Sequence, residues 1–322
     1  MDEQHIELLA QIASFYYEHN LKQNEIAART GYSRSMVSRL LNEAREKGIV
    51  EVRINYSLLR CLDIEEALQQ ALNLRIVRVL ARGTLGNNQM LRKLGSMAAR
   101  LVEELVSQGA RKIGVSWGTA LWETISAMHK VNFPDTRICQ IIGSSGSLNP
   151  EIDGPDLARH LAEALGGQYF TIPAPLLVES PPTRAALMHD PTIARIMQET
   201  QNMDLALVGI GSMDPESSSW IRSGYLDQEQ ILSLVNQGVV GDVCGIIFDR
   251  QGNLLEHPIC ERVVGINSEA LKRIPLKLGI SAGGMKTVPI LGACRAGLVN
   301  CLVTDEVAAL GILETFREDR EM

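Results

Sequence analysis

The sequence predicts an α/β protein with a small N-terminal helical module and a large domain built on a Rossmann-like parallel sheet. Two observations indicate this organisation. Residues 23–47 have the pattern of a helix-turn-helix, and from Arg75 onward short apolar segments alternate with amphipathic helical segments. The 322 residues suffice for two domains, and a composition that is 45% apolar but only 4% aromatic predicts a mostly aliphatic core.

The helix-turn-helix pattern is QNEIAARTGYSRSMVSRLLNEAREK. A short helix over 23–30 is followed by Gly31, which can adopt the positive φ of a sharp turn at little cost. Ser33 then caps a second helix. The apolar residues of this second helix recur at helical spacing: Met36, Val37, Leu40, Leu41 and Ala44. An amphipathic helix over 6–19 is expected to pack across the pair and complete a three-helix unit.

Nucleic acid is the partner that this motif predicts, although a plain helical hairpin with a solvated face is the alternative. Hydroxyl and guanidinium groups on such a helix contact base edges and phosphates in the major groove. We expect DNA contacts from Gln23, Ser33, Arg34, Ser35, Met36, Ser38 and Arg39. The net charge of the chain is −7, but residues 29–53 carry six basic and three acidic side chains. One such module binds weakly, so an oligomer that reads repeated half-sites is expected.

A strand and a connecting helix are predicted between the two parts. The segment IVEVRIN alternates apolar and polar residues over 49–55, which suggests a small wing beyond the second helix. Residues 58–74 are predicted to form a helix with a leucine stripe. The stripe consists of Leu58, Leu62, Leu68 and Leu72. It either packs onto the next domain or pairs between chains, and we favour partial involvement in an oligomer.

The alternation of strands and helices in the large domain is typical of a mostly parallel sheet with helices on both faces. Strands are expected at 76–80, 112–116, 137–143, 204–210, 243–248, 276–280 and 300–303. Helices are expected at 88–107, 118–128, 154–165, 285–296 and 305–316. The segment 173–182 contains four prolines and is predicted to be a loop.

Three loops after predicted strands are rich in small residues. They are SWGTA (116–120), GSSGS (143–147) and SAGGMK (281–286). Ligands of open α/β sheets bind beyond the carboxyl ends of the strands, and backbone N–H groups exposed there suit an anion such as phosphate. Lys286 follows the Gly283–Gly284 pair as a point charge, Ser144 and Ser145 add hydroxyl groups, and Asp242 can accept from sugar hydroxyls. No loop has a Walker or GxGxxG pattern, but together they favour a sugar or phosphosugar pocket over glycines that serve geometry alone.

The cysteines and histidines give no sign of a metal site or a cofactor. Six residues of each type are scattered without a CxxC pair or zinc-ligand spacing, so we expect reduced thiols, no metal and no cofactor. No apolar run is long enough to span a bilayer, and no basic-then-apolar segment opens the chain. These features predict a cytoplasmic protein without a membrane partner.

Several segments, in this order, resemble the SorC (sorbose-operon regulator) family of bacterial transcription factors. They are LKQNEIAARTGYSRSMVSRLLNEAREKGIVEVRI near the start, GVSWGTAL in the middle, and GVVGDVCGIIFD, VVGI and GLVNCLVTDEVAALGIL near the end. The resemblance implies a helix-turn-helix domain and an effector domain similar to sugar-phosphate isomerases. It also implies a homo-oligomer, typically a tetramer, with operator DNA and a sugar or phosphorylated sugar as partners.

Carried over by position, the resemblance implies an effector pocket that combines the loops identified above. The residues concerned are Trp117, Gly118, Gly143, Ser144, Ser145, Asp242, Gly283, Gly284 and Lys286. Many relatives have a glycine pair or a Gly-Thr-Thr run where this chain has Gly143–Ser145. The expected domains are 1–56, helix-turn-helix; 57–74, linker helix; and 75–322, effector binding and oligomerisation.

We therefore expect a repressor or activator of a carbohydrate-utilisation operon, controlled by a sugar or sugar phosphate. The alternative is a sugar-phosphate isomerase fused to a DNA-binding module. Isomerisation requires a carboxylate base and usually a second acid, and Asp242 has no evident acidic partner, so we expect no enzyme activity and no catalytic residues. A DNA-binding scaffold without any ligand is a third possibility, which the three small-residue loops oppose.

Overall fold

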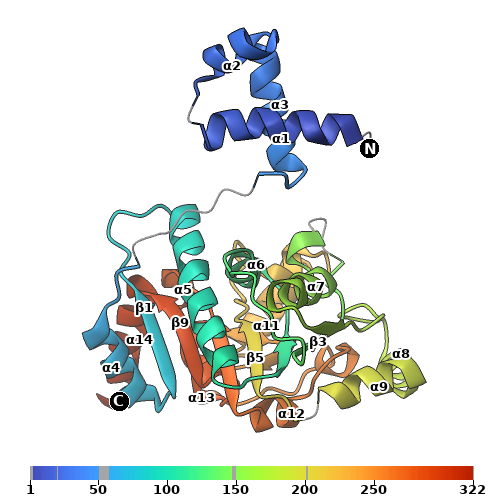
Figure 1. Ribbon diagram of the computed structural model, residues 1–322. Coiled ribbons are helices and arrows are strands. Elements are labelled where there is room, and N and C mark those ends of the chain that lie inside the picture. Colours follow the sequence, from blue (N-terminus) through green and yellow to red (C-terminus); the bar gives the residue numbers. More distant parts are fainter. Residues whose placement is uncertain (1–2, 20, 51–57, 147–149, 201, 322) are drawn as a thin grey trace. The chain divides into compact units, whose positions relative to one another are not determined.

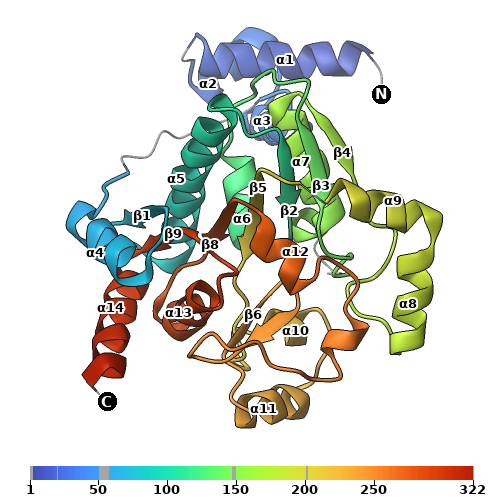
Figure 2. The same cartoon turned by 90° about the horizontal axis from the view of Figure 1, so that it is seen from below.

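The computed structural model describes residues 3–19, 21–50, 58–146, 150–200 and 202–321. It divides into two compact units, residues 1–57 and 58–322. Each unit has its own buried core, and each is shown in Figures 1 and 2.

The first unit contains three helices, α1 (Glu3–Tyr17), α2 (Gln23–Thr30) and α3 (Arg34–Glu46). Their shared core is formed by Leu9, Ile12, Ala13, Ile26, Val37, Leu40, Leu41 and Ala44. Gly31 ends α2 with φ of 76°, and its N–H donates to the Ala27 carbonyl at 3.0 Å. The Ser33 hydroxyl accepts from the N–H of Met36 and caps α3. The helix-turn-helix prediction is confirmed, whereas most of the predicted 49–55 strand lies outside the described residues.

The second unit is built on a seven-stranded sheet in which every pair of neighbours is parallel. In spatial order the strands are β1 (Ile76–Leu80), β9 (Cys301–Asp305), β8 (Leu276–Ile280), β5 (Leu205–Gly209), β2 (Lys112–Val115), β3 (Arg137–Gln140) and β4 (Gln168–Phe170). The chain runs outward from β2 to β3 and β4 on one side, and from β5 to β8 and β9 on the other. The order therefore reverses between β2 and β5.

Helices cover both faces of this sheet (Figures 1 and 2). One face carries α5 (Asn87–Ser107), α6 (Thr119–Ser126) and α7 (Gly154–Leu165). The other carries α4 (Leu62–Leu72), α13 (Thr287–Arg295) and α14 (Glu306–Glu321). Along β5, Leu205 and Leu207 pack into the core beneath α5, α6 and α7, whereas Ala206 and Val208 pack into the core beneath α4, α13 and α14. Burial on both faces explains why this strand is a continuous apolar run.

The remaining elements lie in the long connections between strands. They are α8 (Pro181–His189), α9 (Pro191–Glu199), α10 (Ser219–Arg222), α11 (Gln228–Asn236), α12 (Ser268–Arg273), and the antiparallel strands β6 (Gly241–Val243) and β7 (Ile246–Phe248). The single strand predicted at 243–248 is wrong, because Cys244 and Gly245 adopt positive φ and reverse the chain. The loop predicted at 173–182 ends early, because Ser180 caps α8 and the following prolines fit its first turn.

The predicted helix over 58–74 begins only at Leu62, because the residues before it are extended along the outer edge of β1. The Cys61 N–H donates to the Val79 carbonyl at 3.0 Å, and the Ala81 N–H donates to the Leu59 carbonyl at 2.8 Å. In the leucine stripe, Leu68 is fully buried while Leu62 is 62% exposed. The stripe therefore packs partly onto its own domain.

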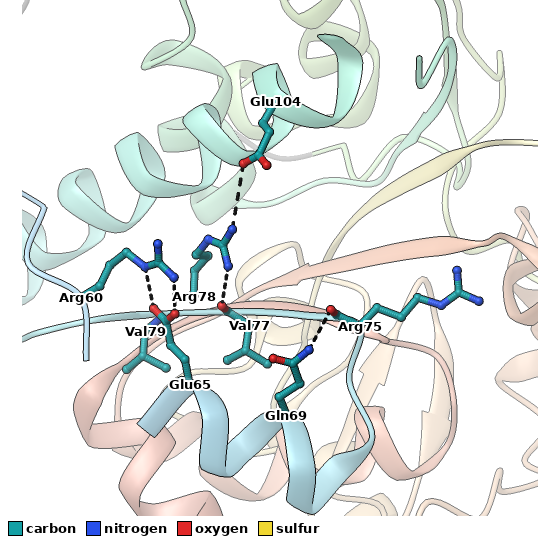
Figure 3. Close-up of polar contacts among 8 residues, drawn as sticks. All are labelled: Arg60, Glu65, Gln69, Arg75, Val77, Arg78, Val79 and Glu104. Atoms are coloured by element: carbon teal, nitrogen blue, oxygen red, sulfur yellow. Dashed lines mark hydrogen bonds and ion pairs between the residues drawn. The ribbon is translucent and has the colours of Figure 1, made fainter. Parts of the chain in front are cut away.

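Side chains from α4 complete the outer edge of β1 (Figure 3). The buried carboxylate of Glu65 accepts from the Val79 N–H at 2.8 Å and pairs with Arg60. Further along, Gln69 donates to the carbonyl of Arg75 at 3.1 Å. An exposed edge strand can pair with another chain through its free backbone groups. These contacts occupy backbone N–H and C=O groups that would otherwise be unpaired at this edge.

Candidate functional site

The exposed surface of the helix-turn-helix lies at the start of α3. Arg34, Ser35 and Arg39 are exposed there, and Ser38 is partly exposed. Ser33 is also exposed, but its hydroxyl serves as the helix cap and lies 2.9 Å from the hydroxyl of Ser35. The other two predicted contact residues, Gln23 at the start of α2 and Met36 on α3, are partly exposed.

The other end of α3 is tied to α1. Glu43 forms ion pairs with His5 at 2.7 Å and with Lys47 at 2.6 Å. Hydrogen bonds from these two groups lower the pKa of Glu43 to about 2. Arg45 donates from Nε to the Tyr17 hydroxyl at 2.7 Å. Consequently the C-terminal half of α3 anchors the helix to α1, whereas its N-terminal half carries exposed and partly exposed polar groups, as the major-groove geometry of this motif requires.

A pocket of about 210 Å³ lies in the second unit, at the carboxyl ends of β2, β5 and β8. This is where the strand order reverses, which is the usual position of ligands in open α/β sheets. Its walls come from the segments 116–121, 209–211 and 280–282, together with Leu91, Ile152, Ser219, Arg222, Ser223, Asp242, Cys244 and Lys286.

Asp242 on β6 is the buried carboxylate of this pocket. Its Oδ1 accepts from the indole N–H of Trp220 at 3.0 Å, and its Oδ2 accepts from the Gly245 N–H at 3.0 Å. Burial raises the pKa of Asp242, while these bonds and the charge of Lys286 oppose the rise. A side chain at position 211 would place Cβ 1.9 Å from Oδ1 of Asp242, so only glycine fits there. The carboxylate is thus fixed, and each oxygen retains a lone pair for a further donor.

Lys286 supplies a positive charge close to this carboxylate. Its Nζ donates to the carbonyl of Ile210, at the end of β5, with a distance of 2.8 Å. Partial burial lowers the pKa of Lys286 to about 8, although the charge of Asp242 opposes the change. The charge of Arg222 lowers the pKa of Lys286 further, and both cations line this pocket.

Arg222 and Cys244 line the pocket but were not predicted from the sequence. Arg222 ends α10, and its Nη1 donates to the carbonyl of Ser217 at 2.8 Å. Its helix has four residues and no glycine-rich loop before it, so the sequence gives no signal for a site. Cys244 is buried at the turn of the β6–β7 hairpin, and burial raises the pKa of its thiol.

The predicted site residues separate into two groups. Trp117, Gly118, Asp242 and Lys286 line the pocket, whereas Gly143, Ser144, Ser145, Gly283 and Gly284 do not. The backbone of Ser144 bonds to Ala174, and both Ser144 and Ser145 bond to Asp153, the neighbour of the pocket residue Ile152.

The described ranges hold neither a metal-binding cluster nor a membrane-spanning helix. They contain no group of three or more histidine, cysteine, aspartate or glutamate side chains arranged to hold a metal ion. Nor does any helix within them have the length and apolar character needed to cross a membrane.

A helix-turn-helix unit joined to a parallel α/β domain with a polar pocket defines a class of protein, the ligand-responsive DNA-binding regulators. Two family comparisons support this class. Residues 56–314 match the family described as "Putative sugar-binding domain", and residues 7–70 match the Crp-like helix-turn-helix domain.

Individual relatives are similar over nearly the whole chain. The sorbitol operon regulator of Klebsiella pneumoniae is 31% identical over 307 residues, which cover 94% of this chain and 96% of that protein. The transcriptional regulator LsrR of Escherichia coli (strain K12) is 31% identical over 312 residues, 96% of this chain and 95% of that protein. The crystal structure of full-length SorC from Klebsiella pneumoniae has a TM-score of 0.73 at 29% identity, covering 97% of this chain and 100% of that chain.

This chain belongs to the SorC family of sugar-binding transcriptional regulators. The predicted family, fold class and regulatory function are thereby confirmed. The relatives are named as regulators, which supports the regulatory interpretation over the isomerase alternative.

Proposed function

We propose that this regulator binds operator DNA through α3 and binds an effector sugar that carries an anionic group, such as a phosphate, in the pocket at the ends of β2, β5 and β8. One observation carries the proposal: a fixed carboxylate, Asp242, and two cations, Lys286 and Arg222, line the same pocket. Carboxylates accept hydrogen bonds from sugar hydroxyls, and cations bind phosphate oxygens.

Each group then has a separate role. Asp242 accepts from hydroxyls of the sugar, because Trp220 and Gly245 already hold both of its oxygens in place. Lys286 and Arg222 hold the anionic group between them, and its negative charge offsets their mutual repulsion. Trp117 and Gly118 stand at the start of α6, whose positive end favours an anion.

The five predicted residues that do not line the pocket are assigned a supporting role. Ser144 and Ser145 connect through Asp153 to the wall at Ile152, and Gly143 precedes them with its N–H bonded to the Val264 carbonyl. Gly283 and Gly284 shape the turn that carries Lys286. In this proposal these five residues determine the shape of the pocket walls. They contact the effector only if the walls move toward it on binding.

For the DNA interface we propose direct contacts from Arg34, Ser35, Ser38 and Arg39. Gln23, Ser33 and Met36 contribute at the edge of the surface, because they are partly buried or already serve the α3 cap. We also propose that the protein is a homo-oligomer, with the tetramer as the expected state. The reason is that a single helix-turn-helix module of modest charge binds DNA weakly.

Thermal melting against a panel of sugars and their phosphates tests the effector assignment. A ligand present at about a hundred times its Kd adds about 2.7 kcal/mol of stability, which is readily seen as a rise in Tm. We expect one phosphorylated sugar to raise the Tm, Lys286→Met and Arg222→Gln to reduce the rise, and Asp242→Asn to remove it.

Arg273→Gln is the matched control, because Arg273 is an exposed cation on α12 that does not line this pocket. The Tm rise should persist in this variant. A rise that survives Lys286→Met and Arg222→Gln together would contradict the anion assignment. A flat response to the entire panel would contradict the effector pocket.

A further inference from the structure

We propose that Arg82 and Asp305 are positioning residues that couple the pocket to the segment leading to the DNA-binding unit. Arg82 follows β1 and Asp305 ends β9, the strand beside it. Their ion pair, 3.0 Å between Nη1 and Oδ2, joins the loop that carries Lys286 to the extended residues 58–61. The pair lies outside the pocket lining.

Asp305 is the centre of the connection. It is fully buried, and its two oxygens face different partners. Oδ2 accepts from Arg82, whereas Oδ1 accepts from the Gly283 N–H at 2.7 Å and from the Ala308 N–H at 3.3 Å in the first turn of α14. A buried carboxylate with a single arginine partner is costly to leave unpaired, so Arg82 and the Gly283 loop are held in a fixed relation.

On the pocket side, the fixed point is Gly283. Its φ of 97° suits glycine, and three residues later Lys286 reaches the carbonyl of Ile210 on the pocket wall. An effector anion that draws the ammonium group of Lys286 away from Ile210 therefore acts on a short turn whose other end is attached to Asp305.

On the linker side, the fixed point is the residue before Arg82. The Ala81 N–H donates to the Leu59 carbonyl at 2.8 Å, and the Cys61 N–H donates to the Val79 carbonyl at 3.0 Å. The backbone N–H of Arg82 itself donates to Glu306 at 3.1 Å. Residues 58–61 are the first residues of the second unit, so in this proposal a shift of Arg82 reaches the start of that unit.

The result is a contiguous series of contacts with the effector group at one end and the linker at the other. Coupling of this kind needs two arrangements whose balance each ligand changes. Here the two arrangements differ in whether residues 59–61 stay paired with 79–81. The inference rests on the proposed function only in placing the effector at Lys286, and its test uses no ligand.

Hydrogen exchange of the Cys61 and Ala81 amides, measured in the full-length protein, reports the linker pairing. Lys286→Met removes the bond to Ile210 and the charge but keeps most of the side-chain volume. We expect it to change exchange at both amides about tenfold, because local opening governs exchange. In a protein that already carries Asp305→Asn, the same Lys286 change should have no further effect.

Asp305→Asn suits this double-mutant test because asparagine caps helices as well as aspartate does, so α14 keeps its start while the charge that holds Arg82 is lost. The matched control is Asp319→Asn. Asp319 also lies on α14, and its substitution breaks ion pairs with Arg250 and Arg295. With the control, the effect of Lys286→Met on the linker amides should remain.

Unchanged exchange at Cys61 and Ala81 in Lys286→Met would overturn the coupling, and so would an equal response in the Asp305→Asn background. If Asp305→Asn does not fold, Arg82→Met replaces it in the double-mutant test. This variant breaks the same Arg82–Asp305 ion pair at its more exposed partner. Because no effector is added, failure here is distinct from failure of the melting panel, which tests the pocket itself.

Discussion

Burial of the Lys286 ammonium group, together with the repulsion of Arg222, lowers its pKa to about 8. Only the charged form attracts an anion. Since the pKa of Lys286 in the free protein is about 8, affinity for a phosphorylated effector should change little between pH 7 and pH 8 and fall about tenfold per unit above pH 8. Calorimetric titration between pH 7 and pH 9.5 measures this directly.

Lys286→Arg provides the control for this pH dependence. A guanidinium stays protonated throughout the range, so affinity in the variant should vary little with pH. A fall of equal steepness in Lys286→Arg would assign the titration to another group and remove Lys286 from the anion contact.

The residues of the pocket differ in how readily they can be predicted from the sequence. Asp242 and Lys286 stand in glycine-containing loops after or beside predicted strands, and this pattern was sufficient to predict them. Arg222 has no such neighbours. It reaches the pocket because Trp220, two residues before it on α10, is held by Asp242. That contact joins positions 22 residues apart and depends on tertiary packing, which no local pattern encodes.

At the scale of elements, the two halves of α3 differ in their contacts. Arg39 is exposed in the N-terminal half, whereas Arg45, also exposed, lies in the C-terminal half and donates to the Tyr17 hydroxyl of α1. We expect Arg39→Ala to weaken binding to a DNA sequence selected by the protein from a random pool by about 1–3 kcal/mol. Fluorescence anisotropy at fixed salt measures the change.

The contrasting variant is Arg45→Ala, which removes the same type of side chain from the anchored half. Its loss of DNA affinity should be smaller, and any effect should come with a lower Tm of the helix-turn-helix unit. Equal losses in the two variants, with Tm unchanged, would mean that DNA contacts both halves of α3.

Helices and strands whose apolar residues recur with a regular period are predicted well from the sequence. The errors in element bounds lie at turns. The apolar run at 243–248 looks like one strand, yet a left-handed conformation at Cys244 divides it into two. A cysteine with φ of 53° is unusual, so the sequence does not indicate a turn there. The sequence predicts helix at residues 58–61 because their leucines continue the period of α4. Pairing with β1, a contact distant in sequence, determines their extended form.

At the scale of the whole molecule, the parallel sheet with helices on both faces follows from the alternation along the chain, but the strand order does not. Continuous apolar strands such as β5 are buried on both faces wherever they lie in a sheet. Their neighbours depend on how the crossover helices pack. The position of the pocket followed from the general behaviour of such sheets and not from any single loop.

Oligomerisation is the prediction that belongs to this scale. If two or more copies bind DNA together, dilution below the dissociation constant of the oligomer should lower the apparent affinity for DNA and make the binding curve steeper. Analytical ultracentrifugation across the same concentrations gives the assembly state. A protein that remains monomeric throughout and still binds with undiminished affinity would contradict the proposed oligomer.

The side chains along the outer edge of β1 also limit how copies can meet. Glu65, Gln69 and the extended residues 59–61 already bond to the backbone of this strand and to that of Arg75 before it. A second chain therefore cannot extend the sheet at this edge without displacing them. Contacts between copies at this edge must instead use side-chain surfaces, which can be separated and re-formed without breaking a continuous intermolecular sheet.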